Sequence, residues 1–145
     1  RVSMFSHGTA QSKCIIQHPK VRYLPPLSYD EMISAIDDCD IAIGQLCLGV
    51  MGMTELEVMA RGKPLIMPFH YDHAYASPPP LVNVKDPSGV ADAVRQLLDD
   101  PVLPASRGQA CREWVARFHA TKNVALQLAK RLKESGFRPQ DIRFE

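Results

Sequence analysis

The chain has 145 residues, 46% of them hydrophobic and 23% charged, which suits one globular domain and excludes a disordered chain. Seventeen basic residues against sixteen acidic ones leave a formal charge of +1, so we expect no nucleic-acid partner. The longest apolar stretch, Leu46 to Met53, is far shorter than the about 20 residues that a transmembrane helix needs. A soluble, cytoplasmic domain is therefore expected.

The cysteines support the same compartment. None of the four forms a Cys-x-x-Cys pair, and they stand in apolar or helical contexts, at Cys14, Cys39, Cys47 and Cys111. This pattern favours buried thiols, rather than disulfides, in a reducing cytoplasm.

The first predicted elements are two strands and a helix. Val2 to Ser6 is β-prone and ends at His7-Gly8, and a second strand, Val21 to Leu24, stops at Pro25-Pro26. Ser28-Tyr-Asp-Glu31 then has the Ser-x-x-Glu spacing of a capping box. We expect a helix from there to about Asp38.

The middle of the chain is typical of a strand, loop, helix and strand unit. Asp40 to Ile43 is the predicted strand, and the loop Gly44 to Gly52 follows it. A helix is expected from Met53 to Arg61, with Gly62 in the position of a left-handed C-cap. Pro64 to Met67 is the next strand.

The last part of the chain is predicted to be mostly helical. After an irregular segment, Pro68 to Pro80, a short strand is expected at Leu81-Val82, and Asp86-Pro87 begins a helix through about Leu98. Apolar spacing predicts two more helices, Ser106 to His119 and Lys122 to Ser135, before a tail from Phe137 to Glu145. The whole pattern indicates an α/β fold, a Rossmann-like parallel sheet with flanking helices and a helical C-terminal end.

The loop from Gly44 to Gly52 is the strongest candidate for a ligand site. In a parallel α/β sheet, ligands bind beyond the carboxyl ends of the strands. Gly49-Val-Met-Gly52 runs into a helix N-terminus, whose N–H groups and dipole favour an anion such as a diphosphate. Glu57 lies one turn into the helix, and its two acceptor oxygens match the two hydroxyls of a ribose. A surface ion pair between Glu57 and Arg61 is an equally good interpretation of the spacing.

A family resemblance favours the ligand site. The stretch CDIAIGQLCLGVMGMTELEVMARGKPLIMPF, Cys39 to Phe69, resembles the donor-binding pattern of retaining GT-B glycosyltransferases, with LEVMARGKPLI matching the family's E-A-M-A-x-G-x-P-V motif. VRYLPPLSYDEM resembles the strand, loop and helix before that site, and Pro80 to Leu132 resembles the closing helices. The resemblance implies that residues 1–145 are the C-terminal, nucleotide-sugar-binding domain of such an enzyme.

The resemblance also implies roles for individual residues. Glu57 would bind the ribose hydroxyls, the backbone around Gly52, Met53 and Thr54 would meet the diphosphate, and the segment that includes Leu24, Pro26 and Leu27 would border the base. The donor would be a UDP or GDP sugar, passed to an unknown acceptor with retention, and neither a cofactor nor a metal is implied.

Two features depart from the family pattern. The family has a further glutamate, eight positions before the one that matches Glu57, and this further glutamate contacts the donor sugar. In this chain its position is taken by Gly49. Gln45 could supply part of that contact. The chain also begins at Arg1 without an initiator methionine or an apolar leader, so we expect a piece of a longer protein. The acceptor site and catalytic residues would belong to a missing N-terminal domain, so no catalytic residue is assigned and the isolated piece should be inactive.

Other interpretations stay open. Phe69-His-Tyr-Asp-His73 contains three metal-ligand side chains, but a structural or substrate-loop role, in which the segment lines the donor pocket, is favoured over a metal site. The basic helix from Lys122 could contact acidic lipids at a membrane surface if the acceptor is a lipid. A nucleotide-sugar epimerase of the same fold, or a non-catalytic nucleotide-sugar-binding or scaffold module, would share the pattern, and Gly49 favours the module.

Overall fold

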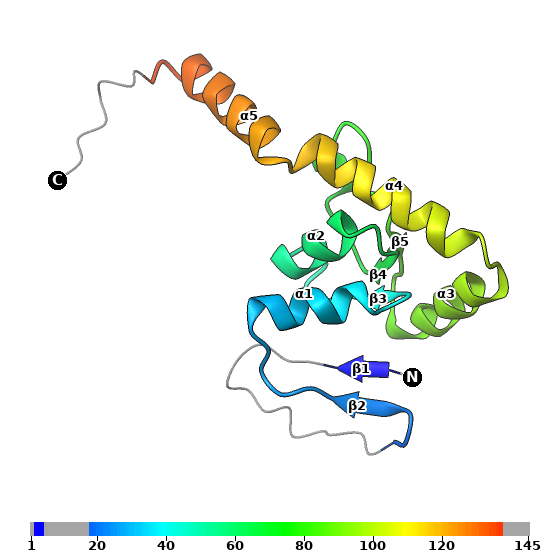
Figure 1. Cartoon of the computed structure of the whole chain (residues 1–145). Coiled ribbons are helices and arrows are strands. Elements are labelled where there is room, and N and C mark those ends of the chain that lie inside the picture. Colours follow the sequence, from blue (N-terminus) through cyan, green and yellow to red (C-terminus); the bar gives the residue numbers. More distant parts are fainter. Residues whose placement is uncertain (1, 5–17, 138–145) are drawn as a thin grey trace. The chain divides into compact units, whose positions relative to one another are not determined.

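The computed structural model describes residues 2–4 and 18–137. It is a mixed α/β structure with short parallel strands and several helices, and it divides into two compact units, Arg1–Asp38 and Cys39–Glu145 (Figure 1). The predicted α/β class is therefore confirmed. Each unit is described by itself below.

The first unit contains a parallel strand pair and one helix. β1 (Val2–Met4) pairs with β2 (Val21–Tyr23), and the end of the predicted first strand, Phe5 and Ser6, lies outside the described residues. α1 (Tyr29–Asp37) begins after Ser28, whose N–H donates to Glu31 Oε2 at 2.8 Å while Glu31 N–H donates to Ser28 Oγ at 3.4 Å. The predicted capping box is confirmed.

The second unit is built on a three-stranded parallel sheet. Its strands are β3 (Ala42–Ile43), β4 (Leu65–Met67) and β5 (Val82–Asn83), in the order β3-β4-β5. β3 begins later than the predicted Asp40. Ala42 N–H donates to Pro64 O at 3.0 Å, and Pro64 has no N–H that could continue the parallel ladder toward Asp40.

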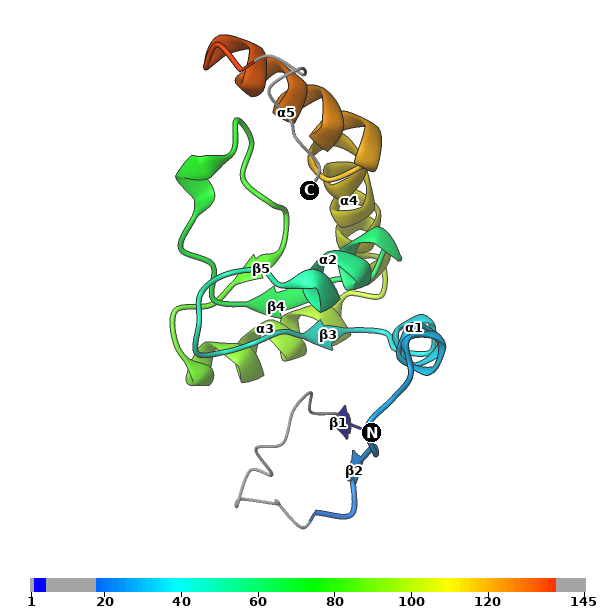
Figure 2. The same ribbon diagram turned by 90° about the vertical axis from the view of Figure 1, so that its left-hand side faces the viewer.

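Helices cover both faces of this sheet. α2 (Met53–Ala60) lies on one face and α3 (Pro87–Asp99) on the other (Figure 2). α3 starts where predicted, because the Asp86 carboxylate accepts from Ser88 N–H at 2.9 Å and Gly89 N–H at 3.1 Å. Between α3 and the sheet lies a buried apolar cluster of Ile66, Val84, Ala93 and Leu97.

α4 (Leu103–Phe118) packs against α2 and α3, and α5 (Thr121–Glu134) continues from it away from the sheet (Figure 1). α4 begins before the predicted Ser106, because Pro104 stands in its first turn, where the missing N–H costs no helical hydrogen bond. Trp114 of α4 is buried in the core.

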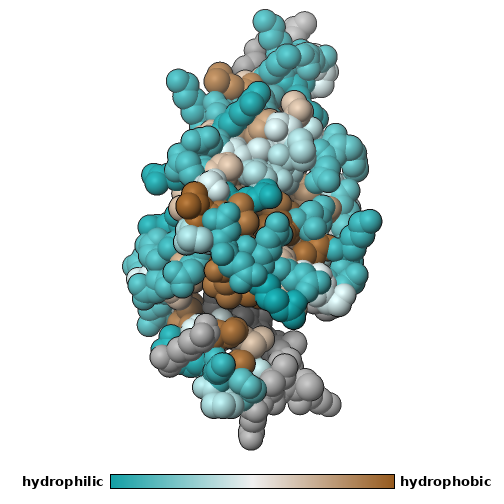
Figure 3. Space-filling view, turned by 90° about the vertical axis from the view of Figure 1, so that its right-hand side faces the viewer, coloured by the Kyte–Doolittle hydropathy of each residue, from teal (hydrophilic) through white to brown (hydrophobic). Residues whose placement is uncertain are grey.

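The surface of the described part is mixed. In Figure 3 hydrophobic residues gather in the middle of the face shown and hydrophilic residues surround them. Within residues 2–4 and 18–137, every helix falls short of the length and apolarity required to span a bilayer.

Candidate functional site

Two loops meet at the carboxyl edge of the β3-β4-β5 sheet. Because the strands are parallel, the loop Gly44 to Gly52 after β3 and the segment after β4 leave from the same edge. His70 N–H donates to Gly49 O at 3.0 Å and thereby joins them. The segment after β4 was expected at this edge, and the structure adds its direct contact with the glycine loop.

A buried glutamate closes the glycine loop. Glu55, only 4% exposed, accepts Gln45 N–H at 3.1 Å and Gly52 N–H at 2.9 Å. A Cβ atom at Gly44 would lie 3.0 Å from Glu55 Cγ, and one at Gly52 would lie 3.0 Å from Glu55 Oε2. A side chain at either end of the loop would therefore be tight against Glu55, and glycine avoids this crowding.

Glu55 is a site residue that the sequence analysis missed. The signal was present, since a glutamate three positions after an N-cap residue has capping-box spacing, and Gly52 is the N-cap of α2. The glycine has no side chain to reciprocate. Glu55 instead makes its second hydrogen bond with Gln45 at the start of the loop.

The predicted diphosphate contacts lie at the start of α2. Met53 and Thr54 form its first turn, and the first helical hydrogen bond runs from Leu56 N–H to Gly52 O at 3.2 Å. N–H groups that precede this bond carry the positive end of the helix dipole. Glu57 is half-buried in the next turn. Gly52, Met53, Thr54 and Glu57 therefore lie at the start of α2, directly after the loop that contains Gly49 and Gln45.

Gly49 is held in a conformation that favours glycine. Its φ is +64°, and a Cβ atom there would lie 2.8 Å from His70 Cδ2. A glutamate at this position would therefore have to displace the imidazole and adopt a strained backbone. Glycine at this position is therefore part of how the loop is built.

The residues predicted to border the base belong to the first unit. Leu24 follows β2 and donates its N–H to Met4 O at 2.7 Å, and Pro26 and Leu27 lie between it and α1. Pro26 is exposed, while Leu24 and Leu27 are half-buried.

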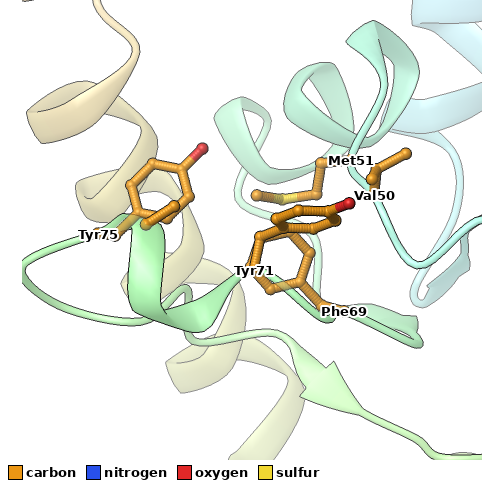
Figure 4. A pocket seen from close by; sticks show the side chains of 6 residues that line it. Val50, Met51, Phe69, Tyr71 and Tyr75 are labelled. Carbon is orange, nitrogen blue, oxygen red and sulfur yellow. The ribbon is translucent and has the colours of Figure 1, made fainter.

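An apolar pocket of about 270 Å³ lies beside the glycine loop. Val50 and Met51 of the loop form one wall, and Phe69 and Tyr71 from the segment after β4 lie against them (Figure 4). Tyr75 stands apart from these side chains, and Ala74 completes the lining. The sequence analysis placed the segment after β4 near a donor pocket but did not predict its pairing with Val50 and Met51, because these walls come from two separate loops.

α4 holds Tyr75 in place. Its ring packs edge-on against Trp114, with centroids 4.7 Å apart, and its hydroxyl lies 3.2 Å from His119 Nε2. Burial raises the pKa of Tyr75 and lowers the pKa of His119, so both stay uncharged at neutral pH and share this hydrogen bond. One wall of the pocket is therefore anchored to a helix.

The histidines and the aspartate after Phe69 separate in space. His70 lies against Gly49, whereas Asp72 and His73 belong to the short 3-10 helix Asp72–Ala74. Among residues 2–4 and 18–137, no group of three or more His, Cys, Asp or Glu side chains could hold a metal ion.

The expectation of buried thiols is only partly right. Cys111 is buried, Cys39 is half-buried and Cys47, in the glycine loop, is exposed, while Cys14 lies outside the described residues. None of the three described cysteines forms a disulfide. Cys47 is exposed because its loop lies at the edge of the sheet.

We expect Cys47 to react with iodoacetamide at least about a hundredfold faster than Cys111 at pH 8. Burial raises the pKa of Cys111 to about 11, so its reactive thiolate is scarce. Peptide mass spectrometry measures each rate, with urea-unfolded chain as the control in which the two rates converge. Equal rates in the folded chain would contradict the burial of Cys111.

Comparisons of the chain with protein-family models, with curated proteins and with solved structures found no match.

Proposed function

We propose that this chain is the nucleotide-sugar-binding half of a GT-B glycosyltransferase and takes a UDP or GDP sugar for transfer, with retention, to an acceptor. The observation that carries the proposal is the glycine loop that Glu55 closes at the N-terminus of α2. This loop stands at the carboxyl edge of a parallel sheet, one turn before Glu57. The motif in Leu56 to Ile66 resembles that of GT-B glycosyltransferases, and this resemblance supports the proposal beside the geometry.

The chemistry of the loop suits a diphosphate. Glycines at both ends of the loop let a phosphate approach the backbone, and the positive end of the α2 dipole favours its charge. Glu57 would accept hydrogen bonds from two ribose hydroxyls. During transfer, the helix N-terminus would stabilise the charge that grows on the leaving diphosphate.

A cycle of two ligands and two proteins tests the role of Glu57. In the unaltered chain, UDP should bind about ten- to a hundredfold more tightly than 2′,3′-dideoxy-UDP, because hydrogen bonds to a carboxylate are worth about 1.5–3 kcal/mol. Glu57→Ala should remove this difference by weakening UDP alone. Titration calorimetry gives the four dissociation constants, and GDP with its dideoxy analogue repeats the cycle for the other base.

The matched control is Glu113→Ala, which removes an exposed glutamate that accepts from Gln109 on α4. It should leave all constants unchanged. Backbone amide shifts of Gly52 to Glu57 report the location of binding. If neither UDP nor GDP moves these amides, the donor site is wrong; if Glu57→Ala weakens both ligands equally, Glu57 does not bind the ribose.

Gly49 favours a second candidate, a non-catalytic nucleotide-sugar-binding module. Its left-handed backbone and the adjacent imidazole disfavour a sugar-binding carboxylate at that position. The whole protein incubated with a UDP or GDP sugar and candidate acceptors separates the two. Steady release of the nucleotide supports a transferase, and tight binding without release supports the module.

A further inference from the structure

His70 stands where a side chain of residue 49 would otherwise begin. Three atoms of its ring lie 2.8–3.0 Å from the Cβ position of Gly49, and its N–H donates to Gly49 O at 3.0 Å. The residue is exposed, so its imidazole is open to solvent on the side that does not cover the glycine. This contact fixes a polar ring on the glycine loop.

The same histidine is next to lining residues of the apolar pocket along the chain, although it does not line the pocket itself. Gly49, which its ring covers, directly precedes the lining residues Val50 and Met51, and His70 stands between the lining residues Phe69 and Tyr71 (Figure 4). The pocket is lined by aliphatic and aromatic side chains, and the imidazole over Gly49 is a hydrogen-bonding group beside them. An apolar hollow with a few placed polar groups is the usual form of a small-molecule site.

We propose that His70 and this pocket recognise the hexose of the nucleotide sugar, an inference that rests on the proposed function. A neutral imidazole has one donor and one acceptor, as a sugar hydroxyl requires. The apolar C–H face of a hexose suits the aromatic wall of Phe69 and Tyr71. Gly49 is three residues before Gly52, a span of at most about 11 Å, so the sugar of a diphosphate bound at α2 can reach His70.

The test compares sugars that differ only in the orientation of one hydroxyl. Dissociation constants are measured for UDP, UDP-glucose and UDP-galactose, and for GDP, GDP-mannose and GDP-glucose. His70→Ala should reduce the discrimination within the preferred pair by about three- to tenfold, the value of one hydrogen bond, and leave UDP and GDP within about twofold. His70→Gln, which keeps a donor and an acceptor, should retain part of the discrimination.

The matched control is His73→Ala, an exposed histidine of the 3-10 helix; the ring nearest the Cβ position of Gly49 is that of His70 and not that of His73. It should leave every ratio unchanged. Unchanged discrimination in His70→Ala would overturn the assignment, as would equal weakening of nucleotide and nucleotide sugar, or an unaltered chain that does not distinguish the sugars. If the unaltered chain binds neither the nucleotides nor the nucleotide sugars, the proposed function itself is wrong.

Discussion

Replacing Gly108 with alanine is expected to destabilise the chain by about 3 kcal/mol, at the upper end of the cost of overpacking. A Cβ atom at Gly108 would collide with Gly62 O and lie 2.7 Å from the Gly62 carbonyl carbon. Both groups are backbone, so no flexible side chain can move aside. α4 would have to shift away from the turn that ends α2.

Gly89→Ala is the matched control, because Gly89 also lies in a helix but has room for a methyl group. Its Cβ would lie 3.5 Å from Val84 Cβ, an ordinary contact. We expect this variant to be unchanged or stabilised by up to about 1 kcal/mol through the lower entropy of the unfolded chain. Urea unfolding followed by circular dichroism compares the two variants, and equal stabilities would contradict the close packing of α4 on Gly62.

The close contact between Gly108 and Gly62 also affects the candidate functional site. Gly62, with φ +71°, ends α2, the helix that carries Glu55 and Glu57. Gly62 N–H donates to Met59 O at 3.0 Å and Lys63 N–H to Val58 O at 3.2 Å. α4 therefore supports the helix of the candidate site from the end opposite to the ligand.

Local signals in the sequence were enough to predict the helix ends. The capping box at Ser28, the N-cap at Asp86 and the left-handed Gly62 each act through hydrogen bonds within a few residues. Such bonds need no knowledge of the rest of the fold. The start of α4 was missed only because Pro104 was not recognised as a first-turn proline.

Contacts between distant segments could not be predicted in this way. The glycine loop and Glu57 follow from the motif, but the contact of His70 with Gly49 depends on β3 and β4 being neighbours. The aromatic pocket depends on the same pairing. A single sequence does not reveal which two loops meet at a sheet edge.

Helical spacing predicted the existence of α5 but not its surroundings. Val124, Leu128 and Leu132 follow one another at four-residue steps, yet their side chains are 45%, 57% and 37% exposed. A periodic pattern shows that residues share one face of a helix. It does not show that anything in the same chain covers that face.

Glu55→Ala is expected to cost about 2–3 kcal/mol of stability, because it removes the acceptor of two N–H groups near the interior. The Gln45 and Gly52 N–H groups would lose their partner, and the loop between them would open. The stability of Glu55→Gln should lie between those of the unaltered chain and Glu55→Ala, since an amide offers one acceptor oxygen where the carboxylate offers two. Urea unfolding measures the three chains, and equal stability of Glu55→Ala and the unaltered chain would contradict the closed loop.

Ligand binding by Glu55→Ala also distinguishes a residue that shapes the site from one that contacts the ligand. If Glu55 only holds the loop, Glu55→Ala should weaken UDP and 2′,3′-dideoxy-UDP by the same factor, because the loss lies in the loop and not at the ribose. Glu57→Ala should instead weaken UDP alone and leave stability nearly unchanged, since Glu57 is only half-buried. The two glutamates lie two residues apart in α2, so a difference between them cannot come from a general loss of this helix.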